Sequence, residues 1–292
     1  MIKAKRLHTP GRDAFIRLRK NKAAMAACIV LLIIIISVPL SLILERLQVI
    51  NPDAQTLTRS LTPPCGSHPM GTDILGRDIL ARCLAGARIS LLVGLAATLV
   101  SLLIGVSWGA AAGYSGGQID NIMMRIVDIL YSLPFIFLVI LLLGLFERSL
   151  LLLFAALGAV QWLTMARIVR GQVLTLRETD FIAAARSIGM GKFRIILVHI
   201  IPNLLGIVIV YATLTVPQIM LQEAFLSFLG LGVPGQEHSW GMLISEGIEA
   251  ITPLKINWWL VVFPGLCITI TLMSLNFIGD GLRDALDPRT MD

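Results

Sequence analysis

The chain alternates between long apolar runs and shorter polar stretches, and its apolar residues come in blocks rather than at a helical or strand period. A helix needs about 20 mostly apolar residues to cross the hydrocarbon core of a bilayer. The third and fourth runs are separated by only a few residues, which indicates a helical hairpin. The predicted spans are residues 23–44, 89–114, 122–146, 149–166, 200–226 and 256–279. This pattern predicts an all-α, polytopic membrane protein with six transmembrane helices.

The placement of basic residues predicts the orientation of these spans. Lysines and arginines crowd residues 1–22, ahead of the first run. Such segments remain on the cytoplasmic side of a membrane. Six spans return both termini to that side, and most of the 24 lysines and arginines then lie inside. We therefore expect a basic cytoplasmic N-terminal segment (1–22), a single transmembrane domain (23–292), outer loops at 45–88 and 230–255, and a cytoplasmic loop at 167–199.

Composition excludes several classes of protein. With 56% hydrophobic and 14% charged residues, the chain has too little charge to cover a water-soluble surface. The net charge of +6 is concentrated at the N-terminus, which favours anionic lipid headgroups over nucleic acid. Residues 23–44 are as long as a span and no small-residue cleavage site follows them, so they are not predicted to be a signal peptide.

The sequence offers no catalytic constellation. Gly191 and Lys192 are followed by Phe193, so the phosphate-binding loop of ATPases is absent. If the protein works against a gradient, ATP and Mg²⁺ must be bound by partner subunits. No cofactor or metal is predicted in this chain. The four cysteines are too scattered to define a disulfide framework, although Cys65 and Cys83 share one outer loop and could pair.

Ionisable residues are nearly absent from the apolar runs, whereas proton-coupled carriers place them at mid-bilayer. Arg125 and Asp128, at the inner start of the third span, could pair with each other. Glu223 lies near the outer end of the fifth span, where it either reaches interfacial water or contacts the substrate. The polar residues left to line a translocation path are Gln161, Gln218, Gln222, Glu223 and Asn276. Such a sparse lining suits a conduit of low affinity.

Glycines recur at every fourth position of the second span. Gly105, Gly109, Gly113 and Gly117 would form a flat strip on which another helix can approach closely. We favour packing within the chain over a dimer interface, although small-residue strips serve both.

A short amphipathic helix is predicted in the cytoplasmic loop. Thr179 and Asp180 are both suitable N-cap residues, and Gly189 suits a left-handed helix stop. Between them, Phe181, Ile182, Ala185 and Ile188 fall on one face. Eight residues make about 12 Å of helix, which is too short to be stable alone. The consecutive alanines Ala183, Ala184 and Ala185 favour a partner's groove over the membrane surface as the support.

Several segments, in order along the chain, resemble the dipeptide/oligopeptide branch of bacterial ABC-importer permeases. Residues 180–189 (DFIAAARSIG) with 199–203 (HIIPN) resemble the cytoplasmic EAA loop of these permeases. The other matching segments are GTDILGRD at 71–78 with RISL at 88–91, GYSGG at 113–117 with Asp120, FLSFLGLG at 225–232, and GDGLRDALDP at 279–288, which is similar to the C-type subunit.

The resemblance implies a permease that forms half of a pore and is not itself an enzyme. Its implied partners are a homologous second permease subunit, two ATP-binding subunits on the cytoplasmic side, an extracytoplasmic substrate-binding protein and the lipid bilayer of the bacterial inner membrane. It assigns ATPase coupling to Asp180, Phe181, Ala183, Ala184, Ala185, Arg186, Gly189 and Pro202. The family's glutamate is replaced by Ala183, so a polar contact from that position is missing.

Peptides are the expected cargo, with nickel, opines or another small solute as alternatives within the same importer class. An ion-coupled secondary transporter is disfavoured by the missing mid-membrane charges. A membrane scaffold is disfavoured by the short amphipathic helix.

Overall fold

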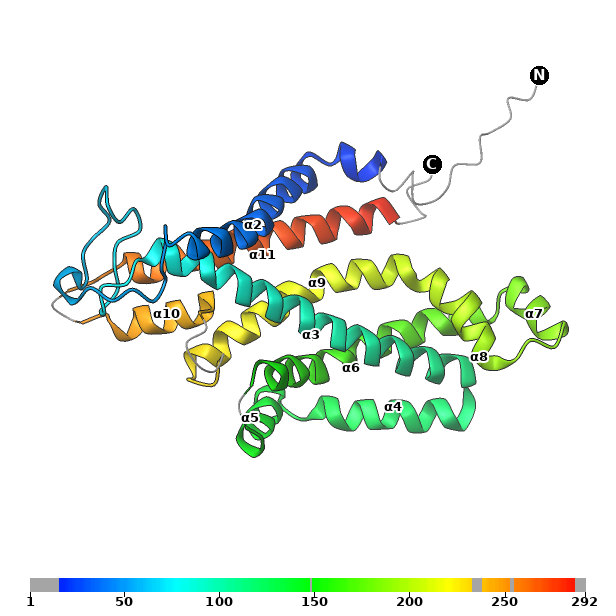
Figure 1. Ribbon diagram of the computed structural model, residues 1–292. Helices are drawn as coiled ribbons and strands as arrows, with labels where there is room; N and C mark the ends of the chain where they lie inside the picture. The colour runs from blue at the N-terminus through cyan, green and yellow to red at the C-terminus, as the bar shows by residue number, and fades with distance from the viewer. Residues whose placement is uncertain (1–15, 148, 233–237, 253–254, 287–292) are drawn as a thin grey trace, which may run out of the picture.

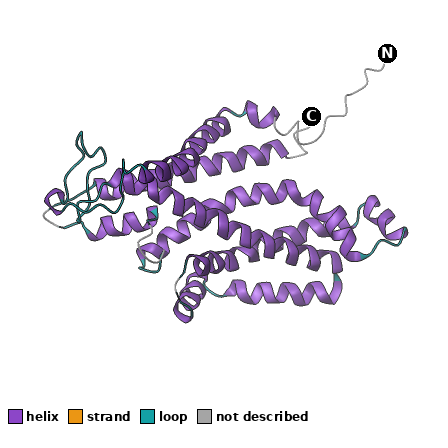
Figure 2. Ribbon diagram, viewed as in Figure 1, coloured by secondary structure: helices purple, strands orange, loops and turns teal. Residues whose placement is uncertain are grey.

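The computed structural model describes residues 16–147, 149–232, 238–252 and 255–286. Within these ranges the chain is helical and contains no β-strand, as predicted (Figure 2). The long helices are α2 (Lys22–Arg46), α3 (Ile79–Ser115), α6 (Leu150–Arg177), α9 (Ile201–Phe228) and α11 (Trp259–Leu286). The shorter elements are η1 (Leu57–Arg59), α4 (Gly117–Ser132), α5 (Phe135–Leu145), α7 (Asp180–Ser187), α8 (Lys192–Ile195), the π-helical turn η2 (Ile196–Ile200) and α10 (Trp240–Glu249).

Among the described residues, five helical segments are long and apolar enough to cross a membrane, and a sixth span results if α4 and α5 are taken together. The axes of α4 and α5 differ by 88°. Pro134 lies in the break between them as the N-cap of α5, and because proline has no backbone N–H it cannot donate a hydrogen bond to the preceding turn. The third predicted span, 122–146, is therefore bent rather than straight.

Several helices extend beyond the predicted spans. α3 begins at Ile79 because the Asp78 side chain caps it by accepting a hydrogen bond from the Ala81 N–H, so residues 79–88 of the predicted outer loop are helical. α6 continues to Arg177 and therefore includes part of the predicted loop 167–199. The predicted outer loop 230–255 contains α10, whose N-cap is Ser239.

The helices form an elongated bundle in which α3, α6 and α9 lie at the centre (Figure 1). α2 packs beside α11, and Gly281 of α11 faces Ala24 of α2. The segment before α3 and the helix α10 gather at one end of the bundle, whereas α7 and α8 lie at the opposite end. Residues with a possible function can therefore lie at either end of the bundle or along the long helices that connect the two ends.

Glycines bring α3 and α6 into close contact. A side chain at Gly109 would overlap the Ala166 carbonyl oxygen, and Gly105 and Gly113 similarly face Met165 and Val173 of α6. This is contact within the chain. Gly117 does not belong to this strip, because it starts α4 after the turn at Gly116 and faces open space.

The α3–α6 contact gives a first prediction. Gly109→Ala should lower the free energy of unfolding by about 1–3 kcal/mol, because the added methyl group overpacks a backbone-to-backbone contact. Gly171→Ala is the matched control, since Gly171 also lies in a helix but has nothing near its added methyl group. Thermal unfolding of the solubilised protein measures both variants. Equal midpoints for the two would contradict this account of the glycine strip.

Candidate functional site

Helix α7 is held at its end of the bundle by an apolar inner face. Ile182 and Ala185 are buried, one turn apart, against side chains of α3, α6 and α8 that include Tyr114, Val173 and Ile195. The helix ends at Gly189, whose φ of +80° requires the left-handed conformation that glycine adopts freely. The Gly189 and Met190 N–H groups donate to the Arg186 and Ala185 carbonyls, which completes a Schellman stop.

The outer face of α7 differs from the predicted one. The sequence placed Ile182 and Ala185 with Phe181 and Ile188 on a single docking face, and this grouping is wrong because the first two are buried within the chain. Phe181 and Ile188 are 43% and 78% exposed, and Ala184 is exposed between them. The exposed coupling candidates here are Asp180, Phe181, Ala183, Ala184, Arg186 and Gly189. Together with the exposed Ile188 they form what we call the α7 face.

Ion pairs and hydrogen bonds join the α7 end to the rest of the bundle. The Arg186 guanidinium lies 5.2 Å from the centre of the Tyr114 ring, near the end of α3. Arg170 of α6 donates two hydrogen bonds, of 2.6 and 2.7 Å, to the Asp120 carboxylate of α4. Pro202 is exposed in the first turn of α9, directly after the π-helical turn. These contacts hold α7 and its neighbouring helix ends in place, so the α7 face has a fixed position at this end of the bundle.

A cavity of about 590 Å³ lies between the α4–α5 break, α6 and α9. It collects three of the five predicted path residues, Gln161, Gln218 and Gln222. Gln218 and Gln222 are four residues apart and so occupy one face of α9. Asn276 is exposed on α11 and does not line this cavity. Asp128, near the cavity, pairs with Arg167 at 2.8 Å rather than with Arg125.

Glu223 faces away from the cavity. It is 1% exposed, and its carboxylate accepts hydrogen bonds of 2.7 Å from the Ser227 and Ser239 hydroxyls. Ser239 is also the N-cap of α10, so Glu223 ties α9 to the start of that helix. Neither sequence alternative, interfacial water or a substrate contact, describes this buried position.

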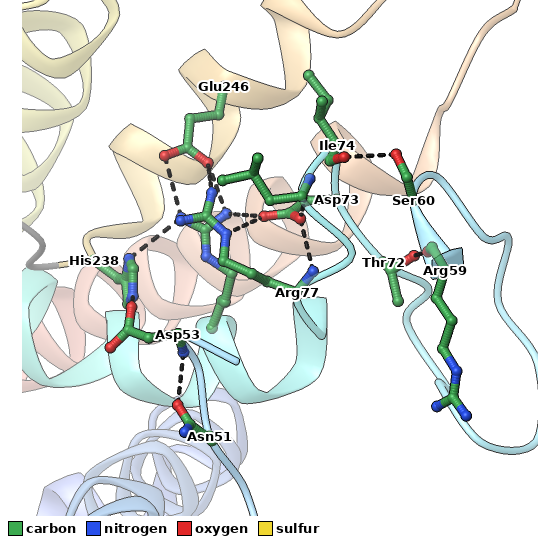
Figure 3. A network of polar contacts seen from close by, with 12 residues as sticks. Asn51, Asp53, Arg59, Ser60, Thr72, Asp73, Ile74, Arg77, His238 and Glu246 are labelled. Carbon is green, nitrogen blue, oxygen red and sulfur yellow. Dashed lines mark hydrogen bonds and ion pairs between the residues drawn. The ribbon is translucent and has the colours of Figure 1, made fainter. Parts of the chain in front are cut away.

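The opposite end contains a polar network that the sequence analysis missed (Figure 3). Arg82 of α3 is 1% exposed and donates to Asp73 at 2.8 Å and to Glu246 of α10 at 2.6 Å. Arg77 also contacts Asp73 and Glu246, at 2.6 and 3.2 Å. We call these four residues the outer charge cluster. It joins the segment before α3, α3 itself and α10.

His238 extends the outer charge cluster to the segment that follows α2. Its Nδ1 lies 3.3 Å from an Arg82 nitrogen, and its Nε2 lies 3.0 Å from the Asp53 carboxylate. Because arginine can only donate, Nδ1 must accept, and the neutral ring then carries its hydrogen on Nε2 and donates to Asp53. Figure 3 shows the His238 ring next to Asp53.

Comparison with known proteins identifies the family. Residues 84–292 match the family described as "Binding-protein-dependent transport system inner membrane component". The chain belongs to this family. Residues 9–64 match the "N-terminal TM domain of oligopeptide transport permease C". The protein is thus a permease of an ABC-type importer and not an enzyme, since separate subunits of such importers hydrolyse ATP.

Three relatives are similar over nearly the whole permease. The oligopeptide transport system permease protein OppC of Haemophilus influenzae is 47% identical over 278 residues, which cover 95% of this chain and 88% of the relative. The Escherichia coli K12 OppC protein is 46% identical over 290 residues, covering 98% and 95%. The dipeptide transport system permease protein DppC of Bacillus subtilis is 45% identical over 278 residues, covering 95% and 85%.

The cysteines of the permease are free thiols. Cys65 is exposed in the segment before α3, whereas Cys83 is buried inside α3, so the pair suggested by the sequence does not form. Cys83 packs in an apolar cluster with Ile79, Trp240 and Leu243. Within the described ranges, no group of His, Cys, Asp and Glu side chains is arranged to hold a metal ion.

His238 gives the permease a pH-dependent stability. Burial, and then the charge of Arg82, lower the pKa of His238, and this outweighs the opposing effect of Asp53. The folded protein therefore binds this proton less readily than the unfolded chain, whose histidine pKa is about 6.5. Stability from this group is complete above about pH 6.5 and is lost as the pH falls below it.

We expect the unfolding midpoint of the solubilised permease to fall as the pH is lowered from about 8 to about 5.5. Replacing His238 with Asn should flatten this dependence, because asparagine does not titrate. Replacing His68 with Asn is the comparison: it removes a partly buried histidine that contacts Asp78 at 2.6 Å and lies outside the outer charge cluster. An unchanged pH slope in the His238→Asn variant would contradict the assigned neutral state.

Proposed function

We propose that this chain forms half of the translocation pore of an ATP-driven, binding-protein-dependent importer of oligopeptides or dipeptides. The observation that carries the proposal is the glutamine-lined cavity within an otherwise apolar bundle. Lipid tails cannot hydrogen-bond amide side chains, so a polar wall at this depth suits a water-filled path. The peptide cargo is supported by the three relatives, whose names specify dipeptide or oligopeptide transport.

The proposed topology has six spans, with α4 and α5 together forming the third. Both termini and the α7 face lie in the cytoplasm, and α10 with the outer charge cluster lies outside. The excess of basic residues at positions 1–22 supports this orientation. The location of α7 and α10 at opposite ends of the bundle is consistent with it (Figure 1).

The partners follow from these surfaces. A homologous second permease would cover the open side of the cavity and so complete the pore. Two ATPase subunits, which bind ATP and Mg²⁺, would dock on the α7 face through Phe181, Ala184 and Ile188. The substrate-binding protein would land on the outer segment before α3 and on α10. The membrane would be the bacterial inner membrane, which is supported by the family's description as an inner membrane component.

The test is reconstitution of the permease pair, the ATPase subunits and the binding protein in liposomes. We expect uptake of radiolabelled trialanine that requires ATP and the binding protein and persists with an ionophore. The permease alone should not hydrolyse ATP. Uptake that stops when an ionophore collapses the ion gradient, with ATP present, would instead identify a secondary transporter. Transport of a metal ion but no peptide would redirect the cargo assignment.

A further inference from the structure

Two cysteines from distant parts of the chain meet near one end of the bundle. Cys83 lies in the second turn of α3, and Cys267 lies in the third turn of α11. Their side chains are within hydrogen-bonding distance of each other. Both also line one cavity of about 160 Å³ between α2, α3 and α11. The packing of two separate helices therefore holds the two thiols side by side.

The cavity beside these thiols belongs to the α10 end of the bundle. Met70 of the segment before α3 and Trp240, the first residue of α10, both line it. The Trp240 indole N–H donates a 2.8 Å hydrogen bond to the Cys83 carbonyl, which holds the start of α3 against α10. In the proposed topology this end faces the extracytoplasmic space, a compartment in which disulfides form and persist.

The two thiols differ in their access to a reagent. Cys83 is 4% exposed within its apolar cluster. Cys267 is only partly buried, so part of its surface is open to a small oxidant. A buried cysteine that has no second thiol beside it is chemically inert. Here the partly buried thiol can react first, and the buried thiol then supplies the second sulfur.

We propose that Cys83 and Cys267 are a redox-active pair that a disulfide oxidant converts into a covalent bond between α3 and α11. Cys267 loses its proton and attacks one sulfur of the oxidant, which forms a mixed disulfide and releases one thiolate. Cys83 then loses its proton and attacks the Cys267 sulfur, which releases the second thiolate. The two protons pass to the released thiolates. The protein is oxidised by two electrons, and the oxidant's disulfide is reduced to two thiols.

Such a bond would change the stability of the bundle. α11 packs against α2, α9 and α10 as well as against α3. A bond to Cys83 would therefore fix the central helix α3 to a helix that touches three others. It would also close a long loop, from residue 83 to residue 267, and long closed loops restrict the unfolded chain most. The oxidised permease should therefore unfold at a higher temperature than the reduced permease.

The test treats membranes that contain the full-length permease with dipyridyl disulfide, a small oxidant that enters apolar regions. Remaining thiols are blocked with N-ethylmaleimide in denaturant, and the protein is digested with trypsin without reduction. Trypsin cleaves after lysine and arginine, which places the two cysteines on separate peptides, residues 83–88 and 256–283. A disulfide joins these two peptides, and mass spectrometry measures the joined species.

The joined species should be about tenfold or more as abundant as any species that joins residues 83–88 to the peptide of Cys65, because a disulfide needs sulfurs already in contact. Cys65 is the internal control, since its thiol is exposed but does not line this cavity. Oxidation should also raise the unfolding midpoint of the native permease, and dithiothreitol should reverse the rise. In Cys267→Ala, Cys83 should remain a free thiol and the oxidant should leave the midpoint unchanged.

Recovery of the peptides 83–88 and 256–283 with separate pyridyl or maleimide adducts, and without a joined species, would overturn the proposal. Equal joining of Cys83 to Cys65 and to Cys267 would also overturn it, because contact in the fold would then not select the partner. If Cys267→Ala does not insert, Cys267→Ser gives the same comparison. None of these outcomes depends on the cargo, so the proposed function is tested separately.

Discussion

Replacing Arg82 with methionine should lower the free energy of unfolding of the permease by about 3–5 kcal/mol, because it removes a buried cation and leaves its carboxylate partners in place. The Arg82 side chain is 1% exposed, and its contacts with Asp73 and Glu246 measure 2.8 and 2.6 Å. Methionine has a volume similar to that of arginine, so the decrease in the free energy of unfolding would result from the lost charge and not from a cavity. Thermal unfolding of the detergent-solubilised permease provides the measurement.

Two controls separate the outer charge cluster from ordinary surface charge. Arg59 is exposed, and Arg59→Met should cost only about 0–1 kcal/mol. Adding Glu246→Gln to Arg82→Met should recover part of the loss, because it removes one uncompensated carboxylate. Strictly additive losses in the double variant, or equal losses for Arg82 and Arg59, would show that the cluster is not a coupled unit.

Ala184→Trp and Gly189→Val should each reduce ATP-driven uptake about tenfold or more without reducing insertion of the permease. Ala184 lies on the exposed α7 face, where a bulky ring would overpack a fitted contact at a cost of about 1–3 kcal/mol. Gly189 has a φ of +80°, which costs a residue with a side chain about 1–2 kcal/mol. Uptake and ATP hydrolysis in liposomes are measured on the same preparation.

Ala185→Trp provides the contrast for α7. Ala185 is 5% exposed within the chain's own core, so its substitution should lower the unfolding midpoint of the isolated permease. Ala184→Trp should leave that midpoint unchanged and instead reduce co-purification of the ATPase subunits. If Ala184→Trp assembles, hydrolyses ATP and transports like the native protein, the α7 face is not the coupling surface.

The features predicted correctly from the sequence are those set by a local pattern of residues, such as the positions of the helices. Apolar runs located the helices because membrane insertion demands length and hydrophobicity, both of which can be counted. The cap at Asp78 and the stop at Gly189 are local too, although only the second was recognised. The 88° bend between α4 and α5 was missed, since Pro134 was treated as part of a continuous span.

The candidate site was less predictable, because its contacts join residues far apart in the chain. The pairing of Arg82 with Glu246 spans 164 positions, and neither residue carries a local signal of its partner. The sequence could not show whether Ala185 packs inside its own chain or docks on a partner. An amphipathic helix has the same periodicity in both cases. Gln161, Gln218 and Gln222 were found because polar residues are rare in these runs.

The glycine strip of α3 also constrains how such a pore can open. Sliding α3 along α6 would break these close contacts, so we expect the two helices to move together. If the pore alternates between inward-open and outward-open states, the chain must bend at a position outside the α3–α6 pair. The α4–α5 break and the π-helical turn before α9 both border elements that line the cavity, and the chain departs from a straight α-helix at each of them. Transport in this fold would then be a motion of α5 and α9 against a fixed pair of helices.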